Sequence, residues 1–185
     1  MFRGVLVVMA VMSLGIAMAS ETRIELVYFG GAGCGLCKNE DLRATMRKAI
    51  AAIEQESRRR GWTFEAIAVS VDDNQEHGRT FLKTYCDEFS THVCTGHGFK
   101  TDLFQEIIMR APALQEGVSL QVEGVPYLAV VRRNGTQTVL ARYLSGTIVP
   151  FLHWIADTDP VNREDAFACL FDQRCPGVAS QAGSR

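Results

Sequence analysis

The sequence carries little excess charge of either sign, because 19 basic residues stand against 21 acidic ones and give a formal charge of −2. That balance excludes a strongly basic nucleic-acid-binding protein and gives no electrostatic reason for attachment to an anionic membrane. Six cysteines among 185 residues are too few for a disulfide scaffold. With 47% apolar and 22% charged residues, the composition is typical of a soluble globular protein of one domain plus extensions.

The N-terminal hydrophobic run is too short to cross a bilayer. Residues 5–16 are apolar or weakly polar, whereas a membrane-spanning helix needs roughly 20 residues. Arg3 precedes this run, and a small-x-small cleavage motif follows it at 17–19. This layout predicts that residues 1–19 are a secretory signal peptide cleaved near Ala19, with a retained membrane anchor as the alternative. We therefore expect a periplasmic or secreted protein, in a compartment where disulfides form and persist.

Strand and helix patterns alternate along residues 20–158, which are predicted to form one domain. Runs rich in β-branched and aromatic residues predict strands at 24–29, 63–71, 127–132 and 138–144, the last two joined by an Asn134-Gly135 turn. A long helix is predicted between the first strand and Gly61. An insertion at about 77–115 is predicted to form two helical pieces that flank a polar turn at 91–98, and a last helix is predicted from Ile148 onward. This order predicts an α/β fold with a central mixed sheet flanked by helices, followed by a tail at 159–185.

Cys34 and Cys37 form a C-x-x-C motif where the first strand gives way to the first long helix. As a redox pair, Cys34 would lie at a helix N-terminus, where unpaired N–H groups and the helix dipole favour the thiolate. Cys37 could then attack a mixed disulfide formed at Cys34. Two other interpretations stay open: half of a zinc site, although two further ligands at a recognisable spacing are missing, and a structural disulfide, although so short a loop gains little entropy.

Two further motifs accompany the cysteines. Residues 26–29 form the apolar strand that leads into the C-x-x-C motif, and residues 124–128 read Gly-Val-Pro-Tyr-Leu just before the Asn-Gly turn. In order and spacing, these motifs resemble the thioredoxin family over about residues 23–157. The resemblance implies a thioredoxin-like fold, with the helical insertion placed before a strand that begins at a cis proline.

The resemblance also implies a role for each motif residue. Cys34 would be the catalytic nucleophile and Cys37 the resolving thiol. Val125 and Pro126 would bind substrate, with a cis peptide bond before Pro126. The alternative for Pro126 is a trans proline that opens an edge strand.

The chain departs from the thioredoxin pattern at two positions. Tyr28 stands where the family has a buried aspartate, and Gly33 stands where it has a tryptophan. The missing carboxylate removes the usual proton acceptor for the resolving thiol. Glu25 and Glu65 are close in sequence, but strand alternation does not place either beside Cys37. The Gly-Leu dipeptide between the cysteines matches neither reducing nor strongly oxidising members, so the direction of electron transfer stays open.

The other four cysteines lie in pairs that flank turns. Their even number in an exported chain favours two local structural disulfides, Cys86–Cys94 and Cys169–Cys175, although four cysteines allow three pairings. One alternative is a metal site formed by Cys86, Cys94 and two nearby histidines, although no metal is expected. Another is electron relay between one of these pairs and the C-x-x-C motif.

The favoured interpretation is an exported thiol–disulfide oxidoreductase that exchanges disulfides with cysteine pairs of other exported proteins. Electrons would pass through a partner oxidoreductase, soluble or membrane-bound, and no diffusible cofactor is needed. No nucleic-acid partner is expected. The alternative function is a thioredoxin-fold binding module in an envelope assembly, in which the Cys34–Cys37 disulfide is only structural.

Overall fold

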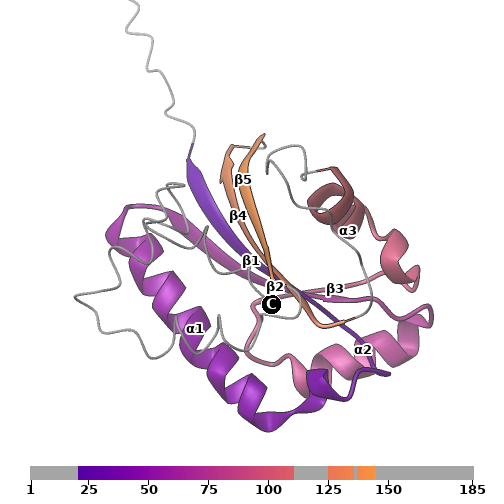
Figure 1. Cartoon of the computed structure of the whole chain (residues 1–185). Coiled ribbons are helices and arrows are strands. Elements are labelled where there is room, and N and C mark those ends of the chain that lie inside the picture. Colours follow the sequence, from indigo (N-terminus) through magenta and orange to yellow (C-terminus); the bar gives the residue numbers. More distant parts are fainter. Residues whose placement is uncertain (1–20, 111–124, 136, 145–185) are drawn as a thin grey trace, which may run out of the picture.

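A five-stranded mixed sheet forms the centre of the computed structural model, which describes residues 21–110, 125–135 and 137–144 (Figure 1). The strands are β1 Thr22–Gly30, β2 Thr63–Ser70, β3 Thr91–Cys94, β4 Tyr127–Asn134 and β5 Gln137–Leu144. Their order across the sheet is β3-β2-β1-β4-β5. The central strand β1 is parallel to β2 and antiparallel to β4. The four strands predicted from the sequence are confirmed, as is the mixed sheet.

Helices cover both faces of the sheet (Figure 1). The two longer ones, α1 (Glu40–Arg59) and α2 (Gln75–Tyr85), lie on one side, while the short α3 (Asp102–Phe104) and the π-helical turn η3 (Gln105–Arg110) lie on the other. Two single 3-10 turns complete the described helices, η1 at Leu36–Lys38 and η2 at Gly98–Lys100. Among the residues that the structure describes, no helix is both long and apolar enough to cross a membrane.

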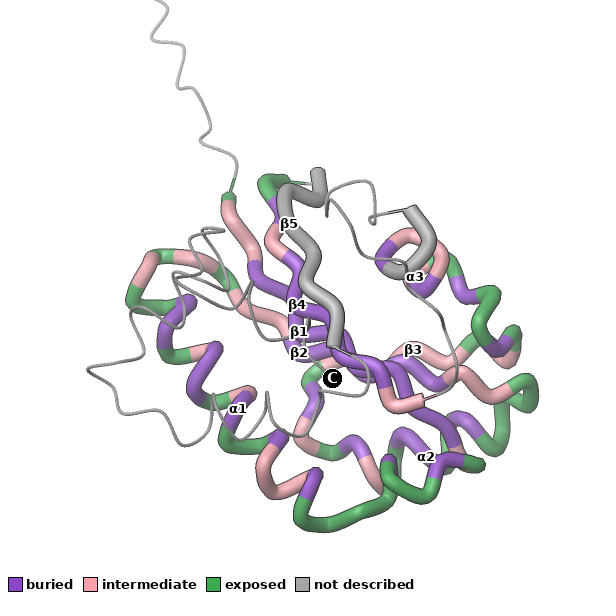
Figure 2. The backbone as a smooth tube through the Cα atoms, viewed as in Figure 1, coloured by how far each residue is buried: buried purple, intermediate pink, exposed green. Residues whose placement is uncertain are grey.

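The apolar run of β1 joins the two halves of the core. Successive side chains of a strand point to opposite faces, so Leu26 and Tyr28 pack against the α1 and α2 side. Val27 and Phe29 pack on the other side, where the Phe29 and Phe104 rings meet with centroids 5.2 Å apart. Figure 2 shows the result, a strip of buried backbone through the middle of the sheet.

Asparagine caps determine where the two longer helices begin. The Asn39 side chain accepts a hydrogen bond from Leu42 N–H at 2.9 Å, and the Asn74 side chain accepts one from His77 N–H at 3.0 Å. Each such cap contributes about 1 kcal/mol to helix stability. Both caps follow directly on the loops that connect β1 to α1 and β2 to α2, so they also hold the ends of those loops in place.

The predicted polar turn at 91–98 is wrong in its first half, because Thr91–Cys94 form β3, which pairs parallel with β2. Four half-buried or exposed residues are too few to show a strand periodicity in the sequence. The strand forms because β2 would otherwise leave its N–H and C=O groups unpaired at the sheet edge. The predicted insertion is thus two helical pieces with an edge strand between them, as far as its described residues extend.

Several predictions fall on residues outside the described part of the chain. These are the signal peptide at 1–19, the helix from Ile148, and the tail at 159–185 with the Cys169–Cys175 disulfide.

Candidate active site

Cys34 and Cys37 lie directly beyond the C-terminal end of β1. The Cys34 N–H donates to the Gly31 carbonyl at 3.0 Å, which closes the turn after the strand. Cys37 lies on the single 3-10 turn η1, and α1 begins only at Glu40. Cys34 therefore precedes this separate turn, and not the first turn of the long helix as the sequence predicted.

The two sulfurs form a disulfide, with an S–S distance of 1.99 Å and a Cα–Cα distance of 5.2 Å. Cys34 keeps 8% of its surface exposed, against 2% for Cys37. Leu36, between them, is an exposed apolar residue. Cys34 is therefore the more accessible residue of the pair.

Two backbone groups contact the Cys34 sulfur. The Cys37 N–H donates to Cys34 Sγ at 3.0 Å, and the Val125 carbonyl oxygen lies 3.5 Å from the same atom. A hydrogen bond to the charged form of a group favours that form, so the N–H stabilises the thiolate once the disulfide is reduced. The Val125 carbonyl can accept a hydrogen bond from the neutral thiol. The site thus holds a partner for each protonation state of Cys34.

The fold brings the Val125-Pro126 segment beside the cysteines. Phe29 of β1 pairs with Tyr127 of β4, so the residues just before β4 lie next to the loop just after β1. The Val125–Pro126 peptide bond is cis, as the resemblance implied. Both residues are half-buried. Their role in substrate binding stays a prediction, while their position next to Cys34 is a property of the structure.

Asp72 holds the loop that carries Cys34. Its two carboxylate oxygens each lie 3.0 Å from the Ala32 N–H, which donates to them, and its Oδ2 accepts a hydrogen bond from Ser70 Oγ at 2.7 Å. No motif of the sequence marks Asp72, which directly follows the strand predicted at 63–71, as part of this site. The available signal was its place after β2, because the carboxyl ends of neighbouring parallel strands meet at one edge of a sheet.

Neither Glu25 nor Glu65 supplies a carboxylate to the cysteines. Glu25 is buried near the start of β1, where it forms ion pairs with Arg23 at 2.6 Å and Arg133 at 2.8 Å. Glu65 lies beside it on β2, 3.7 Å from Arg23. Both belong to the end of the sheet opposite Cys34.

Tyr28, at the position of the missing aspartate, is buried and stacks on Phe89 with ring centroids 5.4 Å apart. Burial raises the pKa of its hydroxyl far above the ordinary value, with smaller contributions from Cys86 and Glu88. The Tyr28 phenol therefore stays neutral and cannot act as a proton acceptor near neutral pH.

The predicted Cys86–Cys94 disulfide is wrong, because both thiols are free. Cys86 caps the C-terminal end of α2, whereas the Cys94 thiol lies 3.3 Å from the Gln75 carbonyl at the other end of that helix. An 11-residue helix separates them, which is about 16 Å at 1.5 Å per residue. A disulfide needs Cα atoms within about 7 Å of each other. Cys94 is the last residue of β3, and this strand places it at the end of α2 away from Cys86.

The alternative metal site has no support in the part of the chain described here. No group of three or more histidine, cysteine or acidic side chains among the described residues could hold a metal ion. The His92 ring instead lies 2.8 Å from the Cys86 carbonyl oxygen.

The strand order, the C-x-x-C disulfide after β1 and the cis proline before β4 together define a thioredoxin-like fold with a paired-cysteine site. No protein-family model and no curated protein matches the sequence.

Solved structures similar to the chain include a thiol-disulfide oxidoreductase from Bacteroides fragilis, at 14% identity over 69% of this chain and 77% of that one, with a TM-score of 0.42. A thiol:disulfide interchange protein from Bacteroides sp. shares 15% identity over 75% of this chain and 76% of that one, with a TM-score of 0.42. A thiol:disulfide interchange protein from Chlorobium tepidum shares 17% identity over 75% and 79%, with a TM-score of 0.35. Likenesses this distant assign no activity, so function must be argued from the chain's own site.

Proposed function

We propose that the protein is an exported thiol–disulfide oxidoreductase that exchanges disulfides with cysteine pairs of other exported proteins. The observation that carries this proposal is the asymmetric disulfide at the end of β1, in which Cys34 is the more exposed of two buried cysteines. The Cys37 N–H, already hydrogen-bonded to Cys34 Sγ, supports Cys34 as the attacking sulfur, because it favours the thiolate that thiol–disulfide exchange requires.

The exchange takes two steps. In the reducing direction, the Cys34 thiolate attacks one sulfur of a substrate disulfide, which forms a mixed disulfide and releases one substrate thiolate. The Cys37 thiol then loses its proton and attacks Cys34 Sγ, so the Cys34–Cys37 bond forms and the second substrate sulfur leaves as a thiolate. Two electrons have then passed to the substrate, and the oxidising direction is the reverse. A dithiol or disulfide of a partner oxidoreductase restores the starting state, without a cofactor.

The surface around Cys34 favours an extended peptide as the substrate. Leu36 is exposed beside the cysteines, and the half-buried Val125 and Pro126 lie on their other side. Pro126 has no N–H donor, so the backbone groups of Val125 are the ones that can pair with an incoming strand. The signal-peptide pattern of residues 1–19 supports substrates in an exported compartment.

Trapping of mixed disulfides tests this function. A Cys37→Ser variant has no resolving thiol, so we expect it to accumulate Cys34-linked adducts with exported cysteine-containing proteins, and a Cys34→Ser variant to accumulate none. Wild-type protein should also equilibrate with glutathione and glutathione disulfide, which gives its reduction potential and the direction of transfer. A Cys37→Ser variant without adducts, together with a wild-type protein that does not equilibrate, would instead indicate the binding module with a structural disulfide.

A further inference from the structure

A small cavity lies beneath the resolving cysteine. Its volume is about 10 Å³, and the polar side chains that line it are Cys37, Tyr28, Arg43, Tyr85 and Glu88. The remaining lining is apolar. A space of this size is close to the smallest that holds one water molecule. Cys37 and Glu88, which are far apart in the sequence, thus share one enclosed space.

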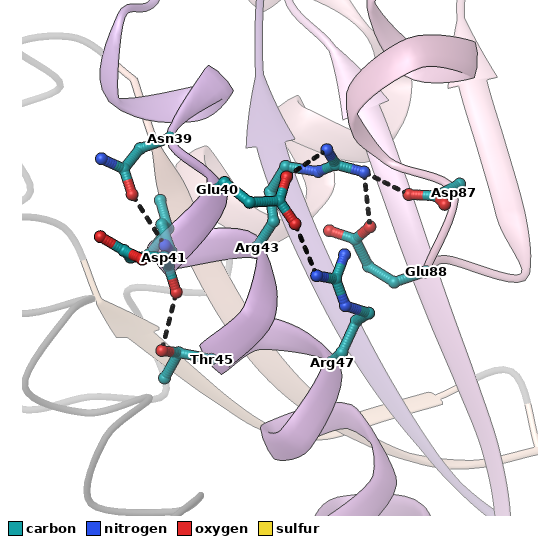
Figure 3. A network of polar contacts seen from close by, with 9 residues as sticks. Asn39, Glu40, Asp41, Arg43, Thr45, Arg47, Asp87 and Glu88 are labelled. Carbon is teal, nitrogen blue, oxygen red and sulfur yellow. Dashed lines mark hydrogen bonds and ion pairs between the residues drawn. The ribbon is translucent and has the colours of Figure 1, made fainter.

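Glu88 reaches this cavity as a buried carboxyl with an unsatisfied oxygen. Its side chain is only 4% exposed, and its Oε2 atom is buried without a hydrogen-bond partner. Arg43 Nη2 lies 3.8 Å from Oε2, which is too far for a hydrogen bond (Figure 3). A buried carboxylate oxygen without a donor disfavours the charged form.

Arg43 is shared among three carboxyl groups and is held mainly by the other two (Figure 3). It donates to Asp87 at 2.5 Å and to Glu40 at 2.8 Å, and both of those carboxylates are largely exposed. Burial raises the pKa of Glu88 to about 7, and the neighbouring Asp87 acts in the same direction, while a hydrogen bond from the Glu88 backbone and the charge of Arg43 offset part of the increase.

The other groups that face Glu88 are less suited to proton exchange at neutral pH. Burial raises the pKa of Tyr28 on β1 far above its ordinary value, and burial followed by the charge of Glu88 raises the pKa of Cys86 to about 12. Tyr85 on α2 has its ring beside the cations of Lys38 and Arg43, each about 5.9 Å from the ring centroid. Tyr28 and Cys86 therefore keep their protons, and the guanidinium of Arg43 keeps its charge.

We propose that Glu88 accepts the proton of the Cys37 thiol as Cys37 attacks the mixed disulfide at Cys34, an inference that rests on the proposed function. The proton moves from Cys37 Sγ to the Glu88 carboxylate, directly or through one water in the cavity. The Cys37–Cys34 sulfur bond forms, the bond from Cys34 to the substrate breaks, and the substrate sulfur leaves as a thiolate that takes a proton from solvent. In the oxidising direction, protonated Glu88 returns the proton to Cys37.

This assignment accounts for the tyrosine at position 28. Cys37 is 2% exposed, so bulk water has little access to its proton. Tyr28 cannot take that proton, whereas Glu88 approaches the same cavity from the segment after α2. The carboxyl function is thus supplied by a different element of the fold.

The test separates the two steps of exchange. Reduced protein is mixed with glutathione disulfide, and the first and second molecules of released glutathione are followed over a range of pH. In Glu88→Gln we expect the first step unchanged and the second slower by about ten- to a hundredfold at pH 7. The wild-type second step should accelerate as pH rises through about 7, the pKa of Glu88. That acceleration should disappear in Glu88→Gln and persist in Glu88→Asp.

Asp87→Asn is the matched control, because it removes a neighbouring carboxyl that also binds Arg43 but does not line the cavity. Its second step should still accelerate with rising pH, with the midpoint moved below that of the wild type because Asp87 contributes to the raised pKa of Glu88. A Glu88→Gln protein with the wild-type rate and profile overturns the role of Glu88 and leaves the proposed function standing. A wild-type protein that releases no glutathione overturns the proposed function itself.

If Glu88→Gln does not fold, the titration of Glu88 in the reduced wild-type protein decides the matter. A carboxyl signal that titrates near 7 and shifts when Cys37 is replaced by serine supports the proposal. A Glu88 carboxyl that titrates at its ordinary value near 4.5 overturns it.

Discussion

Two buried glutamates near opposite ends of the sheet differ in one respect, the number of donors that reach them. Glu25 receives Arg23 at 2.6 Å and Arg133 at 2.8 Å. Glu88 is about as well buried, but its Oε2 atom has no hydrogen bond and lies 3.8 Å from a shared arginine. Burial is therefore similar at the two sites, and the supply of positive charge is different.

This difference indicates which carboxyl is structural and which can do chemistry. A buried carboxylate held by two guanidinium groups joins strands, and removing it leaves a buried charge behind. A buried carboxyl with one oxygen left without a hydrogen bond has its two protonation states closer in free energy near pH 7 and can exchange a proton. Burial alone therefore does not identify a functional carboxyl.

The largest effect is expected for the loss of Cys34, which tests whether disulfide exchange takes place only at the end of the sheet that carries this residue. Cys34→Ser should abolish disulfide exchange, because the attacking sulfur is lost. Cys86→Ser is the control, since the pKa of the buried Cys86 thiol is raised to about 12 and the thiol stays protonated. Single-turnover exchange with glutathione disulfide measures both variants. Exchange that survives in Cys34→Ser, or is lost in a folded Cys86→Ser, would contradict the assignment of the site.

The next effect concerns Glu25 and tests whether this carboxylate contributes to stability alone. Glu25→Gln should lower the free energy of unfolding by about 3 kcal/mol, because Arg133 loses one of its two carboxylate partners in a buried position. Its exchange rate should be unchanged. Urea denaturation measures the loss, with Glu65→Gln as the more exposed control, expected within about 1 kcal/mol of wild type. A slower second exchange step in Glu25→Gln would contradict the purely structural role of Glu25.

A smaller effect is expected at Asp72, which belongs to the Cys34 end but lies outside the cavity. Asp72→Asn replaces one acceptor oxygen with a donor facing the Ala32 N–H, so the loop before Cys34 loses a hydrogen bond. We expect a loss of about 1–2 kcal/mol in unfolding free energy and slower attack by Cys34, measured by denaturation and by the first exchange step. Asp73→Asn, in the exposed neighbouring position, should behave like wild type in both assays.

The smallest effect is the pH dependence of stability that Glu88 contributes. Its folded pKa of about 7 lies above the ordinary 4.5, so the folded state binds more protons than the unfolded state between these values. The stabilising contribution is therefore complete below about pH 4.5 and is lost as pH rises through about 7. Allowing for solvent screening, the loss should be about 1–2 kcal/mol. Denaturation curves should show it in wild type and Asp87→Asn, and a Glu88→Gln protein with the same slope would contradict it.

Much of the fold could be predicted from local patterns. The four longer strands have apolar, β-branched runs, and the long α1 helix has an apolar stripe, so their periodicity is visible without knowledge of their neighbours. The edge strand β3 was missed because four residues carry no readable period and the strand exists only through pairing with β2. The Cys86–Cys94 disulfide was predicted for the same reason, since a missed strand made the two thiols seem close.

The sequence by itself was enough to place the paired cysteines after β1, because the C-x-x-C motif and the strand before it are adjacent in the chain. Its resemblance to the thioredoxin family implied the cis proline before β4, which the structure contains. Only the tertiary structure decided which acidic side chains meet the site. Asp72 reaches the Cys34 loop because β1 and β2 end at the same edge, and Glu88 lines the same cavity as Cys37 although it follows the C-terminal end of α2. The residues of these two pairs, Ala32 with Asp72 and Cys37 with Glu88, are 40 and 51 positions apart in the sequence, and the partner of a buried charge depends on packing that no local pattern records.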